Sequence, residues 1–108
     1  MTGHTASAIL GKWRIVSSDI WDRAFLDLVE PAYILFSPDG RGDFALGAVT
    51  GSLDCSFGEG TASFTWVGSD EMDEVSGSGD AEVKEDGTLE LDLNRHLGDE
   101  ATFVAQKW

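Results

Sequence analysis

The segment Thr88-Leu89-Glu90-Leu91-Asp92-Leu93-Asn94 alternates strictly between apolar and polar side chains. Successive side chains of a β-strand point to opposite faces of a sheet, so the leucines share one face and the acidic residues share the other. We expect the leucine face to pack on a core and the acidic face to meet water. Such alternation is typical of antiparallel sheets and predicts a mostly β protein.

Similar alternation extends over most of the chain, with turn residues such as Pro38-Asp39-Gly40 and Asp86-Gly87 between the segments. In residues 61–67, for example, Phe64 and Trp66 share one face. The segment 74–85 is long, and its Gly77-Ser78-Gly79 stretch predicts a bulge or bend. The predicted strands, about eight in all, are 12–17, 32–36, 42–48, 52–57, 61–67, 74–85, 88–94 and 101–107.

In residues 19–30 the apolar side chains recur at the spacing of a helix and do not alternate as in a strand. Asp19 can cap the start of a helix here, and Pro31 ends it. The sequence therefore predicts one short helix after the first strand, which could lie across one end of the structure as a lid. The apolar residues at helical spacing are Ile20, Trp21, Phe25, Leu28 and Val29.

The predicted architecture is a small antiparallel up-and-down β-barrel. A sheet of eight short strands has two unpaired edges, and closing the sheet on itself removes them. A β-sandwich is the alternative. The chain of 108 residues has the size of one domain, which we assign to residues 11–108, with residues 1–10 as an N-terminal extension.

The charge balance argues against several partners. The chain has 20 acidic and 7 basic residues, a formal net charge of −13, and its Lys and Arg are dispersed singly along the sequence. Nucleic acid and anionic membranes both require clustered cations, so neither is an expected partner. The acidity is typical of a solvated surface, and it also permits capture of a basic protein partner.

The expected location is cytoplasmic. Cys55 is the only cysteine and has no disulfide partner, which suits a reducing compartment. Residues 1–10 carry no basic region followed by a long apolar run, as a secretory signal would. The sequence leaves monomer and homodimer open.

Polar motifs for chemistry are sparse, so we predict no catalytic residues, no metal site and no cofactor. The run Asp70-Glu71-Met72-Asp73-Glu74 is rich in carboxylates but lacks the ligand spacing of a calcium-binding loop. His96, near Asp99 and Glu100, is the one candidate for acid–base work. An enzyme that uses His96 with nearby carboxylates is therefore one alternative.

The aromatic residues suggest another function. Ligand pockets are mostly apolar with a few placed polar groups, although the same rings can simply pack a core. The favoured hypothesis is a non-catalytic barrel that binds a small apolar ligand, and an acidic protein-interaction module is a further alternative. The candidate ligand-binding residues are Trp13, Tyr33, Phe44, Asp54, Phe64, Trp66 and His96.

The triplet Gly11-Lys12-Trp13 resembles the first-strand signature of lipocalin-like (calycin) barrels. The resemblance implies a β-barrel in which Trp13 closes one end beneath a basic residue from the last strand. Lys107 lies in the predicted last strand, and Arg14 is the nearer competitor for that role.

Most of residues 11–108 also resembles a family of small bacterial proteins without an assigned activity. The resemblance implies a compact domain and no particular chemistry. The matching segments are Trp21-Asp22, residues 27–34, Phe44, Gly47-Ala48-Val49, Leu53-Asp54, Trp66, residues 70–73, Ser76-Gly77 and residues 96–100.

Overall fold

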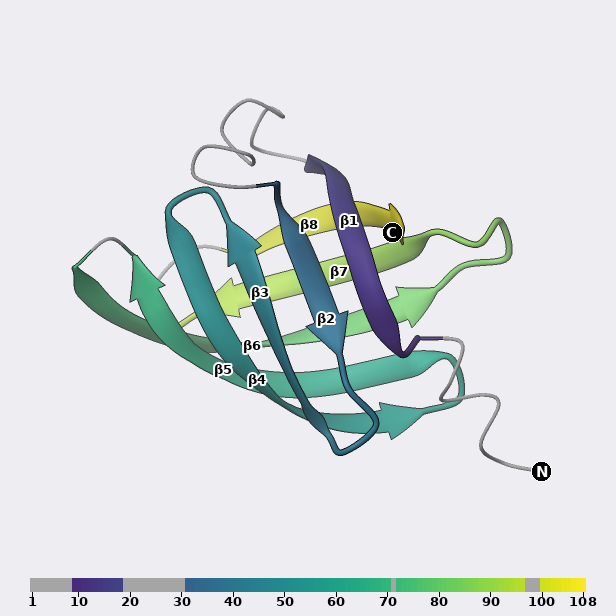
Figure 1. Cartoon of the computed structure of the whole chain (residues 1–108), viewed down its shortest axis with the longest axis horizontal. Coiled ribbons are helices and arrows are strands. Elements are labelled where there is room, and N and C mark those ends of the chain that lie inside the picture. The colour runs from purple at the N-terminus through teal and green to yellow at the C-terminus, as the bar shows by residue number, and fades with distance from the viewer. Residues whose placement is uncertain (1–8, 19–30, 71, 97–99) are drawn as a thin grey trace.

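The computed structural model describes residues 9–18, 31–70, 72–96 and 100–108. These residues form eight antiparallel strands that close into a barrel in chain order. Figure 1 shows the strands following one another around the barrel until β8 meets β1. The strands are β1 (Gly11–Ser18), β2 (Tyr33–Phe36), β3 (Arg41–Leu46), β4 (Val49–Gly58), β5 (Thr61–Asp70), β6 (Asp73–Val83), β7 (Leu89–Arg95) and β8 (Glu100–Lys107).

The pairing of β1 with β8 closes the barrel. Trp13 lies opposite Lys107 and Arg14 opposite Gln106, and the register shifts between Ile15 and Ser17. Every other neighbouring pair is a simple antiparallel ladder between consecutive strands. The predicted mostly β, closed, eight-stranded antiparallel architecture is therefore confirmed.

Two predictions about glycines are wrong. The expected strand 42–48 ends earlier, because Gly47 adopts a φ of 61° in a turn whose flanking residues Leu46 and Val49 pair directly. Positive φ at a hairpin turn favours glycine. The expected bulge in 74–85 is absent, since residues 73–82 pair with β5 and residues 77–83 pair with β7, each in an unbroken register.

Two further expectations concern the ends of the first strand. The predicted helix at 19–30 lies outside the described residues. Before β1, Ile9 is fully buried and belongs to the core, so the barrel packs on at least one residue of the segment assigned as an extension.

The core fills the inside of the barrel. Leu89, Leu91 and Leu93 of β7 are all buried, as their alternation predicts. Inward-facing glycines leave room for large rings on the adjacent strand: a Cβ on Gly51 would lie 2.6 Å from Phe44 Cε1, and one on Gly79 would lie 2.6 Å from Phe64 Cζ. The directly opposed pairs of ring and glycine are Phe44 with Gly51, Phe64 with Gly79 and Trp66 with Gly77.

Candidate ligand-binding site

One end of the barrel, which we call the Trp13 end, is filled by side chains. Trp13 is 2% exposed and its Nε1 donates a hydrogen bond to the Ile9 carbonyl oxygen at 2.8 Å. Lys107 Nζ lies 4.6 Å from the centroid of the Trp13 ring and donates to the Leu10 carbonyl oxygen. Partial burial lowers the pKa of the Lys107 ammonium. Lys107 therefore takes the position over the tryptophan that the sequence left open between it and Arg14.

The opposite end, which we call the Arg95 end, contains an apolar pocket of about 70 Å³. It lies beside the β3–β4 turn, the end of β7 and the start of β8. The described part of the pocket wall is almost entirely apolar, and Arg95 at the rim is the one charged residue among its described lining residues. The lining residues are Phe44, Leu46, Val49, Trp66, Leu93, Arg95, Ala101 and Phe103.

Trp66 lines this pocket and also carries a buried polar atom. The residue is 5% exposed, and its Nε1 is buried without a hydrogen-bond partner among the described residues. Its ring packs against Phe44 with centroids 5.3 Å apart and planes at 86°. Buried donors are nearly always paired in native proteins, so this unpaired N–H is an unusual feature of the core beside the pocket.

An ion pair lies at the rim. Arg95 Nη1 is 3.1 Å from Asp70 Oδ2, which joins the end of β7 to the end of β5. Alternate residues of a strand face the same side of the sheet. Arg95 lies two residues after the buried Leu93, and Asp70 lies four residues after the buried Trp66, so both positions face inward. The pair therefore sits where the inward-facing rows of β5 and β7 reach solvent.

The structure brings two of the predicted ligand residues together in the pocket, Phe44 and Trp66. Phe64 is buried deeper in the barrel, with its ring centroid 6.1 Å from that of Phe36. Trp13 is buried at the other end, beneath Lys107. These four rings thus belong to one core but only two of them line the pocket.

The other three predicted residues do not line it. The Tyr33 ring is half-buried, with Lys12 Nζ 4.5 Å from its centroid. Asp54 is exposed, since the inward-facing side chain at this point of β4 is Leu53. His96 is also exposed and lines a shallow outer depression with Ser76 and Asn94, whose described lining residues include no carboxylate.

Six lining residues were not predicted from the sequence: Leu46, Val49, Leu93, Arg95, Ala101 and Phe103. Alternation did mark Leu93 as facing the core, and it gives Phe103 the same orientation. An inward-facing residue lines a pocket if it lies near an end of the barrel and packs the core if it lies near the centre. Which of the two applies depends on the register of all eight strands. Arg95 is charged, so the pattern of apolar residues could not mark it as a pocket residue.

The fold also gathers some of the dispersed cations. Lys12 Nζ lies 4.3 Å from the centroid of the Trp108 ring, and the Arg14 guanidinium lies 5.7 Å from it. With Lys107 opposite Trp13 in the register, three of the seven basic residues lie on β1 and the end of β8. Sequence spacing alone therefore underestimated their clustering.

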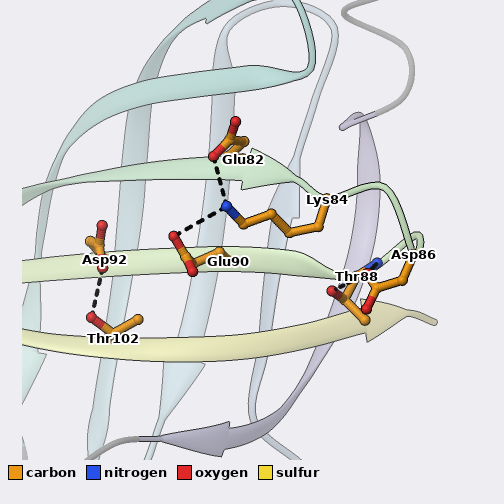
Figure 2. Close-up of polar contacts among 7 residues, drawn as sticks. All are labelled: Glu82, Lys84, Asp86, Thr88, Glu90, Asp92 and Thr102. Atoms are coloured by element: carbon orange, nitrogen blue, oxygen red, sulfur yellow. Dashed lines mark hydrogen bonds and ion pairs between the residues drawn. The ribbon is translucent and has the colours of Figure 1, made fainter.

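The outer face of β6 and β7 carries directly opposed acidic residues. Asp80 lies opposite Asp92, and Glu82 lies opposite Glu90. Like charges in this arrangement repel each other. Figure 2 shows Lys84 Nζ between the second pair, 3.0 Å from Glu82 Oε1 and 3.6 Å from Glu90 Oε1.

Hydroxyl groups donate hydrogen bonds to the other opposed pair, Asp80 and Asp92. Ser63 Oγ donates to Asp80, and Thr102 Oγ1 donates to Asp92 at 2.7 Å, the second contact being visible in Figure 2. Near the β6–β7 turn, hydrogen bonds from Thr88 lower the pKa of Asp86. The acidic surface is thus organised by local hydrogen bonds and by one lysine.

Cys55 is half-buried and packs against the core from β4. Burial, followed by the charge of Asp54, raises the pKa of its thiol to about 11. Because the thiolate is the nucleophilic form, this cysteine is a poor nucleophile at neutral pH.

The described part of the chain defines a class of protein: a closed, eight-stranded antiparallel β-barrel, an architecture compatible with a calycin-like fold. Comparison with protein-family models, curated proteins and solved structures found no match. Among the described residues, no helix has the length and apolar character needed to cross a membrane.

Proposed function

We propose that this protein is a non-catalytic barrel that binds a small apolar molecule in the pocket at the Arg95 end. The observation that carries the proposal is a pocket bounded by Phe44, Trp66 and Phe103 and by short aliphatic side chains. Burying the apolar surface of a guest there would be favourable in proportion to the area removed from water.

The size of the pocket limits the guest. An apolar cavity of roughly 150 Å³ holds benzene. The pocket here is about 70 Å³, because the large rings opposite the inward-facing glycines occupy most of the barrel. By this comparison the pocket itself holds about three heavy atoms, and the remainder of a larger guest would extend beyond the rim.

Kinship with lipocalin-like barrels belongs to the same proposal. It is supported by the geometry at the Trp13 end, where Lys107 covers the tryptophan of the first strand. A cytoplasmic location is also proposed, supported by the single free cysteine, Cys55, which suits a reducing compartment.

The proposal is tested by titrating methylenecyclobutane into the protein and following methyl and amide resonances by NMR. We expect saturable shifts at residues around Phe44 and Phe103. The variant Ala101→Leu should abolish them, because its larger side chain would occupy the pocket. Val104→Leu adds bulk to the outward-facing side of the same strand and should bind as the wild type does.

Two results would contradict the proposal. One is the absence of saturable binding to the wild-type protein. The other is equal binding to the wild type and to a folded Ala101→Leu variant, which would place the guest somewhere else.

A second candidate function is an interaction with a basic protein partner. It is favoured by the opposed carboxylates on the outer face of β6 and β7, whose repulsion a cationic partner would relieve. The double variant Asp80→Asn/Asp92→Asn should then weaken binding of a lysine-rich peptide more than the control Asp54→Asn/Glu59→Gln does, at equal net charge. Equal weakening by both would indicate only nonspecific attraction to the acidic protein.

A further inference from the structure

The outer wall of the barrel carries cations and an indole ring together where β1 and β8 lie side by side (Figure 1). Lys12 and Arg14 face outward from β1, because the residue between them, Trp13, is buried in the core. Trp108 follows β8, and its backbone N–H donates to the Lys12 carbonyl oxygen at 3.1 Å. The closing ladder thus joins residues that are far apart in the sequence.

The Lys12 ammonium lies between two aromatic rings. Its Nζ is 4.3 Å from the centroid of the Trp108 ring and 4.5 Å from that of the Tyr33 ring. The Arg14 guanidinium is 5.7 Å from the Trp108 centroid. Rings attract a cation but do not neutralise its charge. In the part of the chain that the structure describes, no carboxylate forms an ion pair with Lys12, whose side chain is exposed.

Apolar side chains are exposed on the same surface. Trp108 is 57% exposed and Val104 is 38% exposed, and they are two of the four exposed large hydrophobic residues in the described ranges. Val104 and Gln106 flank the buried Ala105, so they face outward, and Gln106 lies opposite Arg14. We call the following five residues the Trp108 surface: Lys12, Arg14, Val104, Gln106 and Trp108.

The composition of the Trp108 surface favours a protein partner. Tryptophan and arginine are enriched among the residues that dominate the binding energy of protein interfaces. Nucleic acid and anionic membranes are bound by larger groups of cations, with about four to eight Lys or Arg in membrane-binding tracts. Only Lys12 and Arg14 supply charge here, which suits a short acidic segment.

The neighbouring strand limits where such a segment can lie. Glu90 of β7 is directly opposite Val104, so the acidic outer face of β6 and β7 begins one strand away from β8. An acidic segment is attracted to Lys12 and Arg14 and repelled by Glu90. This contrast in charge confines it to β8, β1 and the strands beyond β1.

We propose that the Trp108 surface is the docking site for an acidic segment of a partner protein. An apolar side chain of the segment lies against the Trp108 ring, and carboxylates on either side of it pair with Lys12 and Arg14. The proposal is independent of the ligand pocket, which lies at the Arg95 end, whereas Lys12 adjoins Trp13 at the other end.

The test follows two blocked peptides by NMR at about 0.15 M NaCl, where charges more than roughly 8 Å apart are screened. The acidic peptide has a central leucine flanked by glutamates, and the neutral peptide has glutamine in place of each glutamate. We expect the acidic peptide to give saturable shifts at Arg14, Gln106 and the Trp108 indole. The neutral peptide should bind several-fold more weakly.

Variants locate the binding. Lys12→Gln should weaken binding of the acidic peptide about threefold, the size of an exposed ion pair. Trp108→Ala should weaken it by at least about fivefold, as expected for an aromatic residue central to an interface. Arg41→Gln removes the same charge from an exposed position on β3, and Met72→Ala removes an exposed apolar side chain after β5. Both controls should bind as the wild type does.

Several outcomes would overturn the proposal. They include no saturable shift with millimolar acidic peptide, and equal weakening by Lys12→Gln and Arg41→Gln. Tighter binding of a short oligothymidylate would make the partner a nucleic acid. Sedimentation of the protein alone tests the remaining occupant: a concentration-dependent dimer that Lys12→Gln returns to monomer would place a second copy of the chain on this surface.

Discussion

Lys107 Nζ lies 4.6 Å from the centroid of the Trp13 ring, and the same ammonium group donates to the Leu10 carbonyl oxygen. Lys107, in the last strand, thus contacts both Trp13 of the first strand and Leu10, which precedes that strand. Since β1 and β8 make the closing ladder of the barrel, this contact reinforces the seam on which closure depends.

Substitution of Lys107 should weaken that seam. Lys107→Met keeps most of the aliphatic stem but removes the charge, and it should lower the free energy of unfolding by about 0.5–1 kcal/mol, the size of a partly exposed cation–π contact. Lys107→Arg keeps a cation over the ring and should retain most of the stability. Urea unfolding monitored by tryptophan fluorescence measures both, and a Met variant as stable as the wild type would refute the assignment.

The pairing of rings with glycines gives a second prediction. Gly51→Ala places a Cβ 2.6 Å from Phe44 Cε1, so it should destabilise the barrel by about 1–3 kcal/mol through overpacking. In a Phe44→Leu background the same change should cost clearly less, because the conflicting ring is gone. A double-mutant cycle measured by chemical denaturation checks this.

The control for this cycle is Ser56→Ala, an exposed position on the same strand, which should change stability little in either background. Strict additivity of Gly51→Ala and Phe44→Leu would show that the ring does not rest on the glycine.

The thiol of Cys55 gives a prediction about pH. Its pKa in the folded protein is about 11, against 9.0 for an exposed thiol. Because the folded-state value is the higher one, the associated stability is fully present below about pH 9 and is lost as the pH rises through about 11. Alkylation by iodoacetamide should be slow at pH 8 in the folded protein and should accelerate only near the higher value.

Rapid alkylation of the folded protein at pH 8, at the rate seen in urea, would contradict this account of Cys55. The Cys55→Ser variant provides the blank, since the chain has no other cysteine.

Lys84 gives a prediction about salt. It lies between the opposed Glu82 and Glu90, and its hydrogen bond to Glu82, together with the charges of both residues, raises its pKa. Lys84→Met removes the bridging cation and should lower the melting temperature at low salt. The loss should shrink at about 1 M NaCl, where charges are screened within roughly 3 Å. Lys84→Arg is the matched control, and a loss that does not depend on salt would argue against an electrostatic role.

Much of the fold could be predicted because side-chain alternation is a local signal. The leucines of β7 and the rings of Phe64 and Trp66 face inward as their spacing indicates. The role of Gly77 and Gly79 could not be predicted, because a glycine has no side chain whose face can be inferred. The sequence suggested a bulge, whereas the unbroken register places each glycine opposite a ring.

The candidate site was harder to predict, because a pocket depends on which inward-facing residues meet at one end of the barrel. Phe44 and Trp66 were candidates for their aromatic rings, and they do line it. Tyr33 and Asp54 were chosen for their polar groups, but each neighbours an inward-facing residue and so does not line the pocket itself. Arg95 escaped notice because a charged residue is not expected to continue an apolar row.

The most direct test of the account is a crystal structure of the protein pressurised with xenon, which enters small apolar cavities. We predict a closed barrel of eight strands with xenon bound between Phe44, Trp66 and Phe103. Xenon absent from that position, or a sheet whose first and last strands do not pair, would contradict the account.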